Sequence, residues 1–328
     1  MTRFTLLTAT LIVMIQTAIA HSETEWNGYI QTRFNSNIRT HSEFLIRRGK
    51  FWLQGPLPNV SNLSFKIQVV YCSVKDQSFK VQDAYARYQT SRHTLLAGYL
   101  VPDFTLQRNQ PDAAMPVLER GLVIDGMIHG DRSIARLLGI QYRYDRAKQF
   151  YLGLGIFNAN FNTPGRNTDN TFLYTMRSAY RFLNKRNFFW QAGASFAYRK
   201  LSHQTLPCIY DGTQPISGDD VRWGLEMLWR MHHLEIQGEY LTANIQRDHA
   251  WGYYLYGAYR FAKNMQSMIK IEKFNDLNPE TLNNEYYRVG LNYYLTKQAK
   301  VMGEIIVQFS TEKNNYEAKL QFLIFFNS

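Results

Sequence analysis

Apolar and polar residues alternate along most of the chain from Trp26 onward. In the segment 62–72, positions 63, 65, 67, 69 and 71 are apolar, and positions 64, 66 and 68 between them are polar. The same alternation returns near the C-terminus, where positions 318, 320, 322, 324 and 326 are apolar. A period of two places successive side chains on opposite faces of a β-strand. The chain is therefore predicted to consist mostly of strands that have one apolar face.

This pattern predicts sixteen strands, each near the ~9–11 residues that a tilted strand needs to cross a bilayer. They span residues 26–34, 44–54, 62–72, 80–89, 93–102, 133–145, 149–158, 172–182, 187–198, 220–231, 232–242, 249–261, 265–273, 285–296, 299–310 and 315–327. The predicted fold class is all-β, a transmembrane antiparallel β-barrel.

The connections between these strands support a barrel in the bacterial outer membrane. Those after even-numbered strands are mostly very short, although Gly55-Pro56-Leu57-Pro58 is a little longer. Those after odd-numbered strands are longer and span residues 35–43, 73–79, 103–132, 159–171, 199–219, 243–248, 274–284 and 311–314. Outer-membrane barrels have short periplasmic turns and longer external loops. An even strand number also places both termini in the periplasm.

One long apolar run is present, from Phe4 to Ile15, and it follows Arg3. It ends close to Ala18-Ile19-Ala20, a small-x-small cleavage pattern. This arrangement predicts a cleaved signal peptide over residues 1–20 and one barrel domain over residues 21–328. The alternative is a buried apolar N-terminal helix.

Composition fits the same class of protein. Aromatic residues make up 15% of the chain and charged residues only 19%. Aromatic side chains near strand ends are typical of the interfacial girdles of membrane barrels. A soluble sheet with an aromatic core is the alternative. The two cysteines, Cys72 and Cys208, lack metal-ligand spacing, so we expect isolated thiols, no metal site and no cofactor.

The polar strand faces carry twice as many bases as acids. Alternation assigns to them the bases Arg33, Arg48, Lys50, Lys66, Arg87, Arg143, Arg177, Arg181, Arg199, Arg222, Arg230, Arg260, Lys270, Arg288, Lys300 and Lys319. The acids on these faces are Asp83, Asp145, Glu226, Glu235, Glu239, Glu272, Glu304 and Glu317. A charged interior implies a water-filled lumen, and excess positive charge there favours anions.

The first eight of these bases form the predicted anion pathway. Arg33, Arg48, Lys50, Lys66 and Arg87 are expected to form a ladder that descends from the external mouth along strands one to four, with Asp83 as an acid beside it. Successive moderate sites let an anion enter and leave without being trapped. The alternative is that the lumen charges pair across strands and only solvate the lumen.

The connection 103–132 is too long for a plain hairpin loop, and such loops are usually functional. Its apolar residues argue against a free, solvated tip. We expect it to fold into the barrel and to narrow it, with Asp103, Arg108, Glu119 and Arg120 among its charges. The alternative is an external loop that packs on its neighbours or on another subunit.

Several segments in this order and spacing resemble the phosphate-selective porin family, typified by porins O and P. They are Gly28-Tyr29-Ile30-Gln31-Thr32-Arg33-Phe34, Ile46-Arg47-Arg48-Gly49-Lys50, Gln82-Asp83-Ala84-Tyr85, Ala97-Gly98-Tyr99-Leu100-Val101-Pro102-Asp103-Phe104, Leu118-Glu119-Arg120-Gly121 and Gly139-Ile140-Gln141-Tyr142. The resemblance is strongest over residues 26–145. It implies a sixteen-stranded homotrimeric barrel with a constricting third loop and with anion uptake through an arginine ladder.

Carried over to this sequence, the resemblance implies roles for the Arg47-Arg48 pair, for Asp83 and for the Glu119-Arg120 pair. Alternation makes Arg48 the lumen-facing member of its pair and places Arg47 at the rim. The chain departs from the family at Tyr99-Leu100-Val101-Pro102, where the family often has Lys before the Pro step.

The predicted function is a passive outer-membrane channel of a Gram-negative bacterium that prefers phosphate-like oxyanions. Its expected partners are small inorganic anions such as phosphate and pyrophosphate, outer-membrane lipid and further copies of itself. The alternatives are a weakly selective general porin and a structural or adhesion barrel. An enzyme is not expected, because the chain has no Gly-x-Ser-x-Gly motif. Nucleic acid is not an expected partner, because the bases are spread over many strands.

Overall fold

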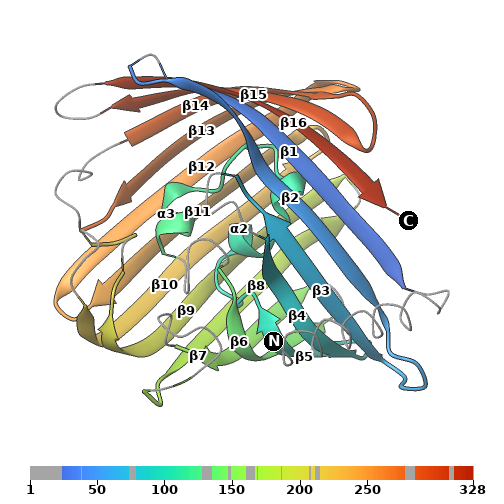
Figure 1. The fold of residues 1–328 in the computed structure, drawn as a ribbon, viewed down its shortest axis with the longest axis vertical. Helices are drawn as coiled ribbons and strands as arrows, with labels where there is room; N and C mark the ends of the chain where they lie inside the picture. The colour runs from blue at the N-terminus through green and yellow to red at the C-terminus, as the bar shows by residue number, and fades with distance from the viewer. Residues whose placement is uncertain are drawn as a thin grey trace, which may run out of the picture.

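The chain forms a closed antiparallel barrel in which each strand pairs with its neighbours in sequence and β1 pairs with β16 (Figure 1). The computed structural model describes residues 24–37, 39–73, 79–127, 135–146, 149–159, 167, 169–185, 187–206, 208–210, 215–277, 285–309 and 314–327. The predicted signal peptide, residues 1–20, lies outside them. No helix in this part of the chain is long and apolar enough to cross a membrane.

The sixteen predicted strands are confirmed. They are β1 Glu25–Asn37, β2 Ser42–Pro56, β3 Leu63–Tyr71, β4 Phe79–Gln89, β5 His93–Leu100, β6 Leu137–Arg146, β7 Phe150–Asn158, β8 Phe172–Lys185, β9 Phe188–Gln204, β10 Ile216–Met231, β11 Leu234–Ile245, β12 Asp248–Ala262, β13 Met265–Asn275, β14 Glu285–Tyr294, β15 Ala299–Phe309 and β16 Asn315–Asn327.

Some differences between predicted and observed strand boundaries have physical reasons. β5 ends at Leu100, two residues earlier than predicted, just before the Val101-Pro102 step. Proline lacks the N–H that would continue the ladder. β9 and β10 extend each other beyond their predicted ends, because Lys200 pairs with Asp219 and Leu201 with Gly218.

One external connection is shorter than predicted. β11 and β12 are joined by only Gln246 and Arg247, where the sequence pattern gave the connection 243–248. Gln246 has φ 56°, a left-handed conformation that suits a two-residue hairpin. The rule that connections after odd-numbered strands are longer therefore has an exception at this hairpin.

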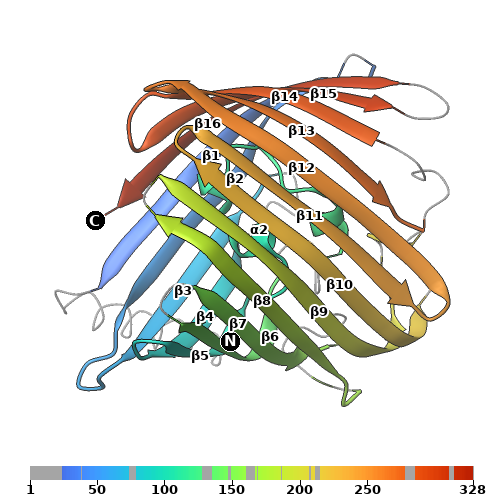
Figure 2. The same ribbon diagram turned by 180° about the vertical axis from the view of Figure 1, so that it is seen from behind.

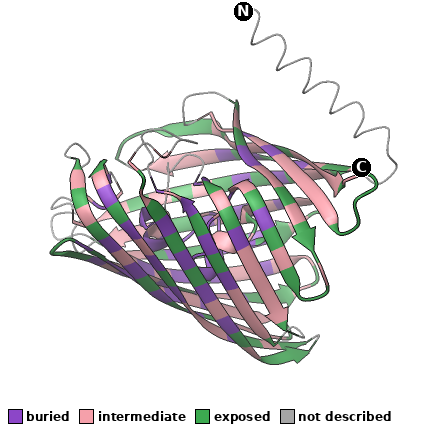
Figure 3. Ribbon diagram, turned by 90° about the horizontal axis from the view of Figure 1, so that it is seen from below, coloured by how far each residue is buried: buried purple, intermediate pink, exposed green. Residues whose placement is uncertain are grey.

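Alternation decides which side chains face outward. In β1, Ile30 is 47% exposed, whereas the next residue, Gln31, is 2% exposed. Buried and exposed positions alternate along many of the strands, as on the side of the barrel seen in Figure 3. The exposed outer surface is rich in aromatic side chains such as Trp190, Trp223 and Tyr287. This surface is the lipid-facing band that the sequence pattern predicts.

Two β-bulges interrupt the alternation on adjacent parts of the wall. Gln31 of β1 pairs with Arg48 of β2, but the next residue, Thr32, pairs with Ile46. Arg47 is thus an extra residue, and a bulge of this kind lets two consecutive side chains point the same way. Arg47 lines the same internal cavity as Arg48, so its predicted position at the rim is wrong.

The second bulge lies in β4. Gln68 of β3 pairs with Asp83, and Val69 pairs with Val81, which makes Gln82 the extra residue. Gln82 and Asp83 are both buried, at 7% and 4% exposed. Both bulges fall inside segments that carry the family resemblance.

The part of the long connection after β5 that the structure describes up to residue 127 lies inside the barrel in both views of the ribbon (Figures 1 and 2). This part, residues 101–127, is called the inner segment below. It contains the short helices α2 Leu106–Asn109 and α3 Leu122–Gly126 and a 3-10 turn, η1 Asp112–Ala114. Its apolar side chains pack into one buried cluster with inward residues of the barrel wall, including Leu241, Tyr254 and Met268.

Candidate functional site in the barrel lumen

Inward acids of the strands β11, β13 and β15 hold the inner segment against one side of the lumen. Glu239 accepts hydrogen bonds from the backbone N–H groups of Leu106 at 2.8 Å and Gln107 at 2.7 Å. Glu272 accepts one from Leu122 at 2.9 Å. In the same way Glu304 accepts one from Leu118 at 2.6 Å. These acids therefore bind backbone donors that would otherwise be buried without partners.

Inward bases on the same side complete this attachment by donating to backbone carbonyls. Lys270 Nζ lies 3.0 Å from the carbonyl oxygen of Arg120, and Lys300 Nζ lies 3.1 Å from that of Met115. Arg222 Nη1 donates to the carbonyl oxygen of Met127 at 2.9 Å. Many charges that alternation assigned to a water-filled lumen thus fix the inner segment in place.

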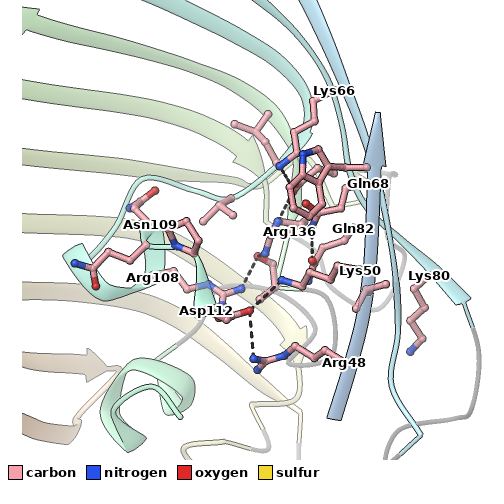
Figure 4. Close-up of a pocket in the computed structure, with 18 of the residues that line it drawn as sticks. Arg48, Lys50, Lys66, Gln68, Lys80, Gln82, Arg108, Asn109, Asp112 and Arg136 are labelled. Carbon is pink, nitrogen blue, oxygen red and sulfur yellow. Dashed lines mark hydrogen bonds and ion pairs between the residues drawn. The ribbon is translucent and has the colours of Figure 1, made fainter. Parts of the chain in front are cut away.

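The opposite side of the lumen is open. A cavity of ≈ 620 Å³ lies between the inner segment and the inward faces of β2, β3 and β4 (Figure 4). We call it the basic cavity. Among the described residues, its basic side chains belong to Arg47, Arg48, Lys50, Lys66, Lys80, Arg108, Arg120, Arg136 and Arg143, and its acidic side chains to Asp83, Asp112 and Asp125.

Strand register places the ladder residues in the predicted order along the wall. Arg48 lies opposite Gln31 and Lys50 opposite Tyr29 in the β1–β2 pair. Lys66 follows further along, opposite Gln54, and Arg87 lies beyond it, opposite Ser64. Arg48, Lys50 and Lys66 line the basic cavity.

Carboxylates of the inner segment contact the upper part of this ladder. Glu119 accepts two hydrogen bonds from Arg47, at 2.8 and 3.0 Å, and also pairs with Arg33. Burial alone would raise the pKa of Glu119, but Arg47 and Arg33 outweigh it and hold that pKa well below its usual range. Glu119 is therefore ionised and locks the inner segment to the wall.

Asp112 forms a second contact of this kind, with the ladder residues Arg48 and Lys50. Its Oδ2 lies 2.9 Å from Lys50 Nζ and 3.3 Å from Arg48 Nη1, as Figure 4 shows. It also pairs with Arg120 of the inner segment. Its side chain is only 6% exposed. Two levels of the ladder thus contain an internal counter-charge.

Asp83 occupies the next level. Its carboxylate pairs with Lys66 at 3.1 Å and with Arg136 at 2.5 Å. Gln82, beside it at the bulge, accepts a hydrogen bond from Gln68. Asp83 therefore holds one cation from the wall and one from the end of the long connection.

Positive charge still dominates the basic cavity. Burial lowers the pKa of Arg108, and the neighbouring Arg136 and Arg48 lower it further. Cations that destabilise the charge on another cation mark a site of positive potential. The cations that repel the charge on Arg108 would attract an anion that entered the basic cavity.

Six predicted site residues lie outside the lining of the basic cavity, namely Arg33, Arg87, Asp103, Glu119, Arg177 and Arg181. Arg177 is bound to Glu226 by two hydrogen bonds of 2.8 and 2.7 Å, and its side chain is 7% exposed. Arg181 pairs with Asp145 at 2.9 Å. Asp103 is fully buried and accepts hydrogen bonds from Tyr151 and Asn109. These contacts tie strands and the inner segment together.

Three further predicted residues, all on strands, differ in their contacts. Arg33 is buried and donates a hydrogen bond to Gln321 at 3.0 Å. Arg87 stacks over the ring of Tyr85, with its Cζ atom 5.7 Å from the ring centroid. Arg143 lines the cavity with a side chain that is 33% exposed.

Sequence reasoning missed Lys80, Asp112 and Arg136 and placed Arg47 at the rim instead of in the cavity. Alternation did not assign Arg47 and Lys80 to the lumen because each bulge shifts the inward parity by one residue. Arg136 comes just before β6 and Asp112 lies in the inner segment, where no strand period applies. Among the described residues, no group of three or more His, Cys, Asp or Glu is placed to hold a metal ion.

The closed sixteen-stranded barrel with an internal segment and a basic cavity defines an outer-membrane porin. The chain belongs to the phosphate-selective porin O and P family, whose model matches residues 26–207, more than half of its length. The porins of this family are channels and not enzymes. No curated protein sequence matches the chain.

Solved structures of porins share the fold at low sequence identity. An anion-selective porin from Comamonas acidovorans is 10% identical, with a TM-score of 0.68 over 93% of this chain and 100% of that one. OmpF of Salmonella typhi is 11% identical, with a TM-score of 0.70 over 92% and 97%. OmpT of Vibrio cholerae, solved in a trimer form, is 11% identical, with a TM-score of 0.64 over 92% and 99%.

Proposed function

We propose that this porin is a water-filled, anion-preferring channel for the passive uptake of phosphate-like oxyanions. The observation that carries the proposal is the basic cavity, whose described lining holds nine basic side chains and three acidic ones. A pore lined by excess Arg and Lys lowers the energy of anions and raises that of cations. Guanidinium groups also match the geometry of phosphate oxygens.

In this proposal the inner segment constricts the channel, and the ladder guides anions along the opposite wall. Residues on the pathway are Arg48, Lys50, Lys66, Arg108, Arg120 and Arg143. Support comes from the attachment of the inner segment to β11, β13 and β15, which confines the open space to the β2–β4 side. The name of the family and the anion selectivity of the Comamonas porin agree with this direction of selectivity.

We further propose that the chain is exported by its signal peptide, residues 1–20, and forms a homotrimer whose barrel domain spans residues 21–328. The trimer form of OmpT supports the trimer, because that protein shares the fold. Cross-linking of purified protein followed by mass measurement tests it.

A weakly selective general porin is a second candidate, and a specific observation favours it. Asp112, Glu119 and Asp83 already pair with the cations at three levels of the ladder. Leu100 and Val101 line the basic cavity at the segment where the family often has Lys. Both features reduce the free energy that a passing phosphate can gain.

Reconstitution of the pure protein in planar bilayers tests the proposal. The reversal potential in a salt gradient reports anion against cation preference, and cation preference or absence of conductance would overturn it. Titration of the single-channel chloride conductance with phosphate, sulfate and pyrophosphate then separates the two candidates. Block by oxyanions at low concentration identifies an oxyanion channel, whereas unchanged conductance identifies a general porin.

A further inference from the structure

Among the described residues of the inner segment, Asp112 is the acid that pairs with cations of both the wall and the segment itself inside the basic cavity. It contacts Lys50 and Arg48 from β2 and Arg120 from the inner segment. Its two oxygens divide these cations between them, Oδ2 for the wall and Oδ1 for Arg120. A carboxylate placed in this way takes the same position and the same donors that a permeating oxyanion would use.

The position of Asp112 is fixed by its backbone. It follows Pro111 and begins the turn η1, in which its carbonyl oxygen accepts a hydrogen bond from Met115 N at 3.4 Å. Lys300 on the opposite side of the lumen holds the carbonyl of Met115 at 3.1 Å. The carboxylate is thus supported from the far wall and reaches across the lumen to the ladder.

We infer that Asp112 sets the specificity of the channel as a tethered competing anion. The inference rests on the proposed function and adds a mechanism to it: a permeating anion must replace the Asp112 carboxylate on Lys50, Arg48 and Arg120 in order to pass. A multivalent oxyanion such as phosphate makes this exchange favourable, because it carries more charge and more acceptor oxygens than a carboxylate. A monovalent anion such as chloride gains much less from it.

The same carboxylate promotes release. After an anion has moved to the next cations, Asp112 returns to its partners and prevents the anion from stepping back. Conduction requires binding that is strong enough for entry and weak enough for exit. A tethered competitor weakens the binding of every anion. It does so without removing the cations that distinguish between anions.

The test is block of chloride current by inorganic phosphate in planar bilayers, with Asp112→Asn compared with wild type. Asparagine keeps the size of the side chain and removes its charge. The half-blocking phosphate concentration is expected to fall about tenfold. The free energy that corresponds to this change is smaller than the Coulomb energy of a close ion pair near a protein surface. Asp112→Glu, which keeps the competing charge, is expected to stay within about threefold of wild type.

Asp125→Asn is the matched control, because Asp125 lines the same cavity and the substitution removes the same charge. It is expected to lower the half-blocking concentration by less than about threefold, since it changes only the general potential. An equal effect of Asp125→Asn and Asp112→Asn would overturn the inference, and so would an unchanged or higher half-blocking concentration in Asp112→Asn. Asp112→Ser provides a second neutral variant if the asparagine variant does not assemble into channels.

Failure of this inference is distinguishable from failure of the proposed function. The wild-type reversal potential decides anion preference and involves no substitution at Asp112. An anion-selective wild type whose Asp112→Asn variant binds phosphate as before would overturn the role of Asp112 alone. A cation-selective wild type would overturn both.

Discussion

Arg47 and Arg48 are consecutive in the chain, yet both point into the barrel lumen. Arg47 Nε lies 2.8 Å from Glu119 Oε1, and Arg48 Nη1 lies 3.3 Å from Asp112 Oδ2. The β-bulge opposite Gln31 and Thr32 makes this possible, because it inserts one residue without continuing the alternation. The bulge thus doubles the positive charge that one level of the wall presents to the inner segment.

The first prediction follows from this geometry and concerns Arg47→Ala. It should reduce the anion preference of the channel about as much as Arg48→Ala does, because both side chains line the basic cavity. Reversal potentials in a salt gradient measure the effect. If Arg47 instead lay at the rim, its replacement would leave the reversal potential at the wild-type value.

The second prediction concerns two levels of the ladder together. Arg48→Gln combined with Lys66→Gln removes two cations from the basic cavity and leaves the partners Asp112 and Asp83 with fewer counter-charges. We expect the reversal potential of the double variant to lie closer to cation preference than that of either single variant, by more than the experimental error. An unchanged value in the double variant would contradict the ladder.

Most of the barrel could be predicted from sequence because each strand is controlled by a local pattern. Ile30 and Gln31 differ in hydropathy, and their exposure of 47% and 2% follows directly. The bulges could not be predicted, since Arg47 and Gln82 extend a polar run in sequence without any signal of where the extra residue lies. The apolar content of the inner segment indicated that it packs inside.

The site was predictable only in part, for a physical reason. Alternation predicts whether a side chain faces into or out of the barrel. It says nothing about which residue that side chain contacts. Lys50 and Lys66 were predicted as inward residues, but the contact of Lys50 with Asp112 depends on how the inner segment lies in three dimensions. The contact of Lys66 with Asp83 joins β3 to β4 beside the bulge at Gln82. Arg136 belongs to no strand, so no period could mark it.

The third prediction tests how the inner segment is held. Glu239→Ala removes the acceptor for two backbone N–H groups, those of Leu106 and Gln107. Each buried donor left without a partner costs about 1–3 kcal/mol. We expect larger fluctuations of the single-channel current, because the inner segment is released from β11.

The matched control for that prediction is Glu235→Ala. Glu235 lies on the same strand with its side chain also inward, and it contacts Tyr256 and Arg230. Its replacement removes the same charge and should leave the current noise as in wild type. Equal noise in both variants would show that charge, rather than attachment of the inner segment, produces the effect.

The fourth prediction concerns pH. Arg47 and Arg33 hold the pKa of Glu119 well below its usual range in spite of burial, so this carboxylate stays ionised while pH falls toward its ordinary value of about 4.3. A lowered pKa means that the contact is present above the ordinary pKa and is lost only as pH falls through the lowered one. The Glu119 contact should therefore contribute no change in chloride conductance between pH 7 and pH 5.

Chloride is the suitable ion for that measurement because it does not itself titrate between these values. No histidine is among the described residues that line the basic cavity. A conductance step between pH 7 and pH 5 that disappears in Glu119→Gln would show that Glu119 takes up a proton there and would refute the prediction.

The last prediction separates two inward arginines that alternation treats alike. Arg177 is bound to Glu226 through two short hydrogen bonds and lies outside the lining of the basic cavity, whereas Arg143 lines it with a 33% exposed side chain. Arg177→Gln leaves Glu226 buried without its partner, and loss of one member of a buried ion pair costs about 3–5 kcal/mol. Denaturant unfolding of Arg177→Gln should show this loss, and its reversal potential should stay near wild type. Arg143→Gln should shift the reversal potential toward cation preference with little change in unfolding. The opposite pattern, in which Arg177→Gln moves the reversal potential further than Arg143→Gln, would place the anion pathway on the β8 side of the lumen and away from the basic cavity.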